Sequence, residues 1–390
     1  MAKPEPPKTG PAPSPTTAVV SDPLPATGTP PPATLWRTIW KECRRDQLVM
    51  AAATFLVAIY GVMLLSGFIA PYTAHFSDRD LAYIPPTPIF VVKDHRPAWP
   101  YVVPYKRVFD AETYNVGFEP DYSRHYPIRL FYSGGAYRLF NLIPTTIHLF
   151  GVDEPGRLFV LGTDQNGHDN FSRLLIGSVP SLTIGFLALL VVFPIGLVYG
   201  GASGYFGGRV DNLMMRLAEI IMSIPQFYLL IALAALLPSD INSTLRFALI
   251  VIILAFIGWA GLSRVIRGMV LSIKEQEYVE AAEALGASSL WVIWRHLIPQ
   301  TATYAIVAVT LGVPGYLLAE SALSFLGLGI QQPDASWGNM LSEAQNLSNI
   351  IYRPWLLMGP GLLIFFTILS FNVLGDKLRD VLDPKSQRTA

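Results

Sequence analysis

Long runs without any Asp, Glu, Lys or Arg recur six times along this chain of 390 residues, and they constrain its fold more than any other feature. The runs span residues 47–69, 179–201, 220–237, 247–263, 300–319 and 354–375. A bilayer hydrocarbon core of about 30 Å requires about 20 helical residues, which matches these runs. The composition agrees, because 52% of the residues are hydrophobic, 14% are charged and the mean hydropathy is +0.40. We therefore predict an all-α integral membrane protein with six transmembrane helices.

Basic residues beside these runs predict how the chain is oriented. Short cytoplasmic loops carry an excess of Lys and Arg. One face of the six-helix arrangement collects most of the basic residues: Arg37, Lys41, Arg44, Arg45, Arg209, Arg216, Arg267, Lys274, Arg295, Lys377, Arg379, Lys385 and Arg388. The opposite face has Arg246 and Arg353 in its short loops. Because an even number of spans places both termini on one side, we predict that the termini and the 265–299 loop are cytoplasmic.

The segment between the first two runs, residues 70–178, is long and polar. Prolines and aromatic residues punctuate residues 70–160, and alternating fragments at 89–92 and 101–103 favour short strands. We predict a small external insertion of mixed or β structure, followed by a capped surface helix that begins near Asp164. The aromatic side chains could contact a substrate, although core packing and anchoring at the membrane interface are commoner roles.

Composition sets the remaining boundaries. Residues 1–34 contain eleven prolines among Thr, Ala, Ser and Gly, a composition that cannot bury a core, so we predict a disordered cytoplasmic tail. Residues 35–69 form an uncleaved N-terminal anchor with the first transmembrane helix. Residues 179–384 form the membrane core with helices two to six, and residues 385–390 form a C-terminal tail.

The cytoplasmic loop at 276–299 has the pattern of a working surface. Read as a helix, its first half aligns four residues on one stripe, with Glu280 beside it: Tyr278, Ala281, Ala282 and Leu285. Gly286 is predicted to end this helix, Ser288 or Ser289 to cap a second one, and Pro299 to fix the entry into the next run. The loop is either a helix that docks into a groove on a partner protein or an ordinary cytoplasmic turn.

Several kinds of chemistry are not expected. Zero net charge gives no sign of nucleic-acid binding, and the single cysteine, Cys43, permits neither an intrachain disulfide nor a metal site. The sequence contains no Gly-Lys dipeptide and hence no P-loop, and no nucleophile and base present themselves as a set, so we predict neither an enzyme nor a cofactor. A metal role for His168 and Asp169 is conceivable, but a capped helix explains both residues.

Charged residues are nearly absent from the middle of the runs. Glu219 lies at the start of the third run and Glu320 near the outer end of the fifth, whereas carriers driven by protons or sodium usually need ionisable groups inside the membrane. We predict that Glu320, Ser321 and Ser324 contribute to a translocation path or its outer gate. Five glycines would permit close helix contacts: Gly185, Gly196, Gly200, Gly258 and Gly261.

Several motifs resemble a known family. Glu280-Ala281-Ala282, Gly286 and Pro299 resemble the EAA loop of ABC importer membrane subunits, with His296 and Ile298 standing where Ile and Leu are common. Further stretches resemble the C-type membrane subunit of oligopeptide and dipeptide importers, namely 161–175, 204–216, 321–329, 336–341 and 374–384. In the first of these, His168 stands where the family usually has Arg.

The resemblance implies a type I ABC importer permease in a bacterial inner membrane. It implies a heterodimer with a second permease subunit, two ABC ATPase subunits, a periplasmic substrate-binding protein and peptide-like cargo, moved by alternating access. The coupling helix that sits in the ATPase would then comprise Tyr278, Glu280, Ala281, Ala282, Leu285 and Gly286. The family also admits glycosides, nickel chelates and opines as cargo. Alternatives are an ATP-independent secondary transporter or channel, or a membrane-anchored receptor.

Overall fold

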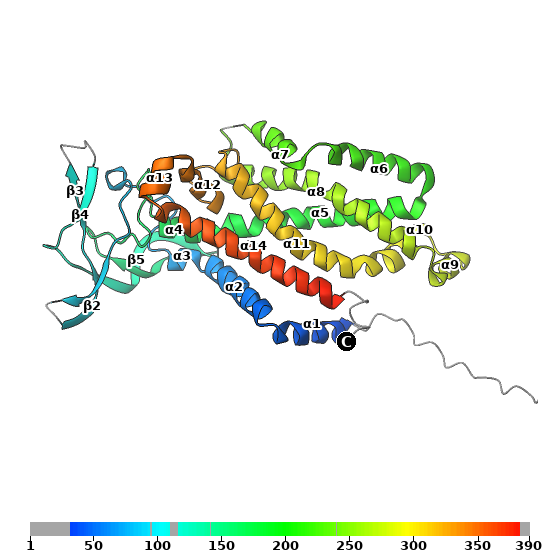
Figure 1. The fold of residues 1–390 in the computed structure, drawn as a ribbon, viewed down its shortest axis with the longest axis horizontal. Helices are drawn as coiled ribbons and strands as arrows, with labels where there is room; N and C mark the ends of the chain where they lie inside the picture. The colour runs from blue at the N-terminus through cyan, green and yellow to red at the C-terminus, as the bar shows by residue number, and fades with distance from the viewer. Residues whose placement is uncertain (1–31, 94–95, 110–115, 141, 239, 383–390) are drawn as a thin grey trace, which may run out of the picture.

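The protein is an elongated helical bundle with β structure at one end (Figure 1). The computed structural model describes residues 32–93, 96–109, 116–140, 142–238 and 240–382. The N-terminal helices are α1 (Pro32–Arg45), α2 (Gln47–Leu64) and α3 (Ser66–Ile69). After the β structure come α4 (Asn170–Ile176), α5 (Ser178–Phe206), α6 (Gly208–Ser223), α7 (Gln226–Ala235) and α8 (Ser243–Ile273). Next are α9 (Glu277–Ala284), α10 (Ser289–Val292), the π-helix η2 (Ile293–Leu297), α11 (Ile298–Phe325), α12 (Trp337–Leu341), the 3-10 helix η3 (Ser342–Gln345), α13 (Leu347–Tyr352) and α14 (Trp355–Leu382).

Within the described residues, four helical stretches are long and apolar enough to cross a membrane, namely α2, α4 with α5, α8 and α14. A fifth is reached if α6 and α7 count as one broken span, since they meet at an angle of 79°. The span predicted at 220–237 is interrupted between α6 and α7, and the uninterrupted helix expected there is not formed. Ile224 is extended (φ −89°, ψ 128°) because the residue before a proline avoids the helical conformation, and Pro225 lacks the N–H that would continue the helix. α11 has 28 residues but is not among the stretches counted above. The count of six spans therefore stays a prediction.

Close packing of α5 against α8 organises the bundle. A Cβ atom added at Gly200 would lie 2.4 Å from the Ser263 carbonyl oxygen, so only glycine lets these helices approach as they do. Gly196 faces the Leu262 side chain of α8, which would lie only 2.7 Å from an added Cβ. Gly185 and Gly258 face Val313 and Tyr316 of α11, so these three glycines also lie at close helix contacts, as predicted. Gly261 has nothing within 4 Å of its added Cβ, and the prediction of a close helix contact there is wrong.

Two antiparallel β-sheets lie between α3 and α4. A four-stranded sheet has the order β1-β2-β5-β6, made of β1 (Ile89–Lys93), β2 (Arg96–Val102), β5 (Tyr126–Leu139) and β6 (Ile143–Val152). A separate ribbon pairs β3 (Tyr105–Phe109) with β4 (Val116–Pro120). The strands expected at 89–92 and 101–103 are present in β1 and β2. His148 of β6 fastens the sheet to the end of α3, because its two ring nitrogens lie 2.5 Å from the Ala70 carbonyl oxygen and 2.9 Å from that of Gly135.

Two predicted features near the helix ends differ in the structure. The helix expected near Asp164 begins only after Asp169, whose side chain accepts from the Ser172 N–H at 2.8 Å, and most of α4 is buried. It is thus a core element and not a surface helix. At the N-terminus, α1 begins at Pro32, inside the segment predicted as a tail. The rest of that tail, residues 1–31, and the tail at 385–390 lie outside the described residues.

Candidate functional site

The loop at 276–299 forms a helical elbow at the end of the molecule opposite the β-sheets (Figure 1). Gly286 has φ +87°, the left-handed conformation that glycine adopts at no steric cost. Its N–H donates to the Glu283 carbonyl at 2.9 Å, and the Ala287 N–H donates to that of Ala282 at 3.1 Å. These two bonds define a Schellman motif, which satisfies the last carbonyls of α9. Ser288 then caps α10, one of the two serines predicted to do so.

Val279 anchors this elbow to the bundle. Its side chain is fully buried (0% exposed) in an apolar cluster formed with residues of α8, α10 and η2: Ile266, Val270, Val292, Ile293 and Leu297. The predicted stripe at 278, 281, 282 and 285 did not include Val279, because Val279 lies on a different face of the helix from the alanines. The sequence signal was the apolar character of Val279 between two polar neighbours, but it did not show which face turns inward.

The stripe itself faces outward. Leu285 is 88% exposed, Tyr278, Glu280 and Ala281 are exposed, and Ala282 is half-buried. Three further apolar residues beside the elbow are exposed: Leu290, Trp291 and Trp294. Large exposed apolar side chains on a short, anchored helix are typical of a surface that inserts into a partner.

An ion pair between Asp211 of α6 and Arg267 of α8 holds these two helices together. The Arg267 guanidinium donates through Nε and Nη2 to both carboxylate oxygens of Asp211 at 2.5 Å, and Ser203 Oγ also donates to this carboxylate. Bidentate pairs of this kind are among the strongest charged hydrogen bonds. Sequence reasoning missed the pair, because its members lie 56 residues apart.

The predicted gate residues lie at the other end of the bundle. Glu320 of α11 is fully buried, and Ser324 Oγ, one turn further along, donates to its Oε1 at 2.6 Å. Ser321 Oγ lies 3.5 Å from Oε2. Ser324 Oγ also accepts from the Ile330 N–H at 3.0 Å, so it joins the buried carboxyl to the loop after α11. The structure brings the three residues together, and their role in a path stays a prediction.

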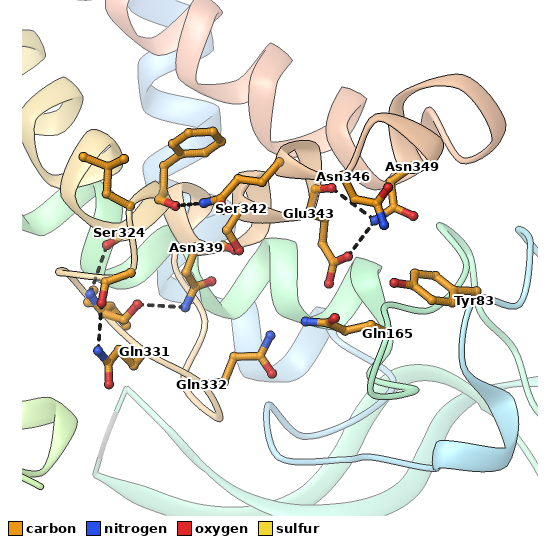
Figure 2. Close-up of a pocket in the computed structure, with 15 residues that line it drawn as sticks. Tyr83, Gln165, Ser324, Gln331, Gln332, Asn339, Ser342, Glu343, Asn346 and Asn349 are labelled. Atoms are coloured by element: carbon orange, nitrogen blue, oxygen red, sulfur yellow. Dashed lines mark hydrogen bonds between the residues drawn. The ribbon is translucent and has the colours of Figure 1, made fainter. Parts of the chain in front are cut away.

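Ser324 also lines a polar cavity of about 470 Å³ (Figure 2). Its lining comes from the loop after α11, from α12, η3 and α13, and from two residues of the β end, Tyr83 and Gln165. Tyr83 has φ +61°, and the Arg353 guanidinium lies 3.9 Å from its ring centroid. Burial raises the pKa of Glu343 above its usual value, as does the Asp164 charge, against the opposing effects of the Gln165 backbone N–H, Arg173 and Arg353.

Comparison with known proteins decides the family. The family described as "Binding-protein-dependent transport system inner membrane component" matches residues 193–388, and "N-terminal TM domain of oligopeptide transport permease C" matches residues 34–86. The chain belongs to the family of binding-protein-dependent transport system inner membrane components, which are permeases.

Three relatives have names that describe permeases. The dipeptide transport system permease protein of Bacillus subtilis (strain 168) is 42% identical over 64% of this permease and 72% of the relative. The oligopeptide transport system permease protein of the same strain is 38% identical over 63% and 78%. The glutathione transport system permease protein of Escherichia coli O6:K15:H31 (strain 536) is 31% identical over 90% and 91%.

The motif at 161–175 of the permease has a structural role. His168 Nδ1 lies 2.7 Å from Asp164 Oδ2, and Arg173 Nη1 donates to the Pro333 carbonyl at 2.9 Å, so the motif joins α4 to the loop before α12. Burial works to raise the pKa of Asp164, but His168 and Arg173 outweigh it and hold the pKa below its usual value. Among the described residues, no group of three or more His, Cys, Asp or Glu could hold a metal.

Proposed function

We propose that this permease is the C-type membrane subunit of an ATP-driven importer of peptides. The names of its relatives specify dipeptides, oligopeptides and glutathione, all of them peptides. The observation that carries the proposal is the elbow of α9, a helix closed by Gly286, anchored by Val279 and exposing Leu285. Such a helix suits a groove on a separate ATPase, to which this chain leaves the hydrolysis of ATP.

In this proposal six spans cross a bacterial inner membrane: α2, α5, α6 with α7, α8, α11 and α14. Both termini and α9 are cytoplasmic, and the β-sheets and the polar cavity are periplasmic. The chain pairs with a second permease subunit to enclose the path. Two ABC ATPases bind at the α9 end, and a substrate-binding protein delivers peptides at the β end. The positive-inside pattern of the sequence supports this orientation.

The mechanism is alternating access. ATP shifts the equilibrium between an inward-open and an outward-open assembly only as far as it binds the two states differently. The α9 elbow transmits that difference to the bundle, because Val279 and its cluster join the docking surface to α8, α10 and η2. Ser324 lies at the outer part of the path, and its hydroxyl donates to the carboxyl of Glu320, which is buried behind it.

Substitution of the exposed leucine tests the docking assignment. Leu285→Arg should abolish co-purification of the ATPase and peptide uptake, since a charge replaces an apolar anchor that the fold itself does not need. Leu142→Arg is the matched control, because Leu142 is 80% exposed at the opposite end of the molecule. It should retain the ATPase. Full ATPase co-purification with Leu285→Arg would show that α9 does not dock.

A further inference from the structure

The polar cavity has one charged residue and no cation to pair with it. Among the described residues that line it, Glu343 is the one with a formal charge, and the others are mostly Asn, Gln and Ser (Figure 2). Glu343 is 9% exposed. A carboxylate this buried is usually paired, because its desolvation is costly.

Only one of the two carboxylate oxygens of Glu343 is used by the fold. Oε2 accepts from Asn349 Nδ2 at 3.0 Å, whereas Oε1 makes no hydrogen bond of normal geometry with the described residues, although the Gln165 backbone N–H faces the carboxylate. No Lys or Arg of those residues lies within 4 Å of the carboxylate. The nearby arginines are engaged elsewhere: Arg353 Nη1 donates to Asn349 Oδ1 at 2.8 Å, and Arg173 donates to backbone carbonyls.

Three amide side chains of the cavity donate to backbone carbonyls of the loop after α11 or of α11 itself. Gln331 Nε2 donates to the Gly327 carbonyl at 2.8 Å, Gln345 Nε2 to that of Phe325 at 2.5 Å, and Asn339 Nδ2 to that of Asp334 at 2.7 Å. The carbonyl oxygens of Gln331 and Gln345 remain as acceptors. A pocket with a free carboxylate oxygen and spare carbonyl oxygens favours a ligand that is rich in donors and positively charged.

We propose that this cavity is an entry subsite that binds the α-ammonium group of the cargo peptide, with Glu343 Oε1 as its partner. The identity of the cargo rests on the proposed function. An ammonium group has three donors and no acceptor, and the N–H groups that follow it along a peptide suit the glutamine carbonyls. The volume of about 470 Å³ lies within the range of roughly 300–1,000 Å³ that small-ligand sites occupy. Ser324 connects the subsite to Glu320 below.

The test measures protection of a reporter thiol in the whole importer reconstituted in lipid nanodiscs. Leu326 lines the cavity and is half-exposed, so Leu326→Cys in a Cys43→Ser background reacts with a maleimide at a rate that reports on occupancy. Triglycine should slow the labelling, and N-acetyl-triglycine, which has no ammonium group, should require at least tenfold more peptide for equal protection. Glu343→Gln, an isosteric change that keeps an acceptor for Asn349, should abolish this difference. Glu219→Gln, at the far end of the bundle, should preserve it.

Each outcome decides the proposal. Equal protection by both peptides, or discrimination that survives Glu343→Gln, would overturn it. Protection by the substrate-binding protein without any peptide would show a docking pocket for that protein and overturn it too. The comparison of the two peptides needs no change at Glu343, so a misfolded variant does not weaken the test. Peptide uptake is assayed separately: amine-selective protection without uptake refutes the proposed function alone, and uptake without protection refutes the subsite alone.

Discussion

The two ends of the bundle differ in which kind of side chain they expose and which kind they bury. At the α9 end, apolar side chains such as Leu285 and Trp294 are exposed, while one buried valine and a Schellman turn hold the helix in place. At the β end, polar groups such as Glu343, Asp164 and Asn349 are buried, and each is hydrogen-bonded to a polar group close by in the sequence. A surface that binds a rigid partner needs exposed apolar anchors on a firm base, whereas a site for a small polar solute needs polar groups held in a low-dielectric setting. The contrast implies that each end can be disabled without the other.

The largest expected effect comes from Val279→Asp. A carboxylate placed in the cluster of Val279, Ile266 and Leu297 has no partner there, and burying an unpaired charge costs several kcal/mol. We expect α9 to detach, so that ATPase co-purification and uptake are lost, while amine-selective protection at Leu326→Cys is retained. Val279→Ile, which keeps the apolar character, is the control. Loss of protection together with docking would show that the two ends are not independent.

The ion pair below the elbow should have a smaller effect. Arg267→Ala leaves the buried Asp211 carboxylate without its bidentate partner, and since Arg267 is 31% exposed we expect a loss of about 2 kcal/mol in unfolding free energy, less than for a fully buried pair. The control Arg216→Ala removes an exposed pair with Glu219 and should cost under about 0.5 kcal/mol. Thermal unfolding in detergent measures both, and equal losses would contradict a special role for Asp211.

At the polar end, stability should depend on pH through Asp169. Burial raises the pKa of this carboxyl from 3.8 to about 7, against hydrogen bonds from Ser172. A carboxyl that keeps its proton longer in the folded than in the unfolded state favours folding at low pH, and this advantage is lost as the pH rises through about 7. The melting temperature should therefore fall between about pH 4 and pH 7, level off above that, and fall less in Asp169→Asn. An identical pH profile for the two proteins would refute the assignment.

The smallest effect is expected at Gly286, in the turn that ends α9. Gly286→Ala forces a side chain into φ +87°, which costs about 1 kcal/mol, although nothing lies within 4 Å of the added Cβ. Docking should weaken severalfold without being lost, as measured by ATPase retention during washing. Gly315→Ala, also with open space but within helix α11, is a control that should leave ATPase retention unchanged.

Sequence reasoning found features encoded locally and missed those that depend on packing. The apolar runs, the Gly286 turn and the Ser288 cap were predictable, because each depends on a few adjacent residues. The side of α9 that turns inward was not predictable, since the burial of Val279 depends on residues of three other helices. The break at Pro225 was overlooked, although a proline within an apolar run gives a direct local signal.

The cavity around Glu343 had no local signal. Its lining brings together Tyr83, Gln165 and residues between 324 and 349. The local sequence of each of these three segments gives no sign that they meet. Glu320, Ser321 and Ser324 were predictable as a group because they lie within one turn or so of a single helix. Their connection to the loop through Ile330 required the fold.

Helix α11 starts directly after η2, without a loop, and ends at the residues that floor the polar cavity. With 28 residues and a rise of about 1.5 Å each, it is roughly 42 Å long, and in the proposed mechanism it acts as a lever. A tilt of about 5° at its elbow end moves the far end by roughly 4 Å, more than the length of a hydrogen bond. Pro314 removes one internal hydrogen bond near the middle of this lever and makes it compliant there. The stiffness of α11 around Pro314 therefore sets how much of a movement at the elbow reaches Ser324.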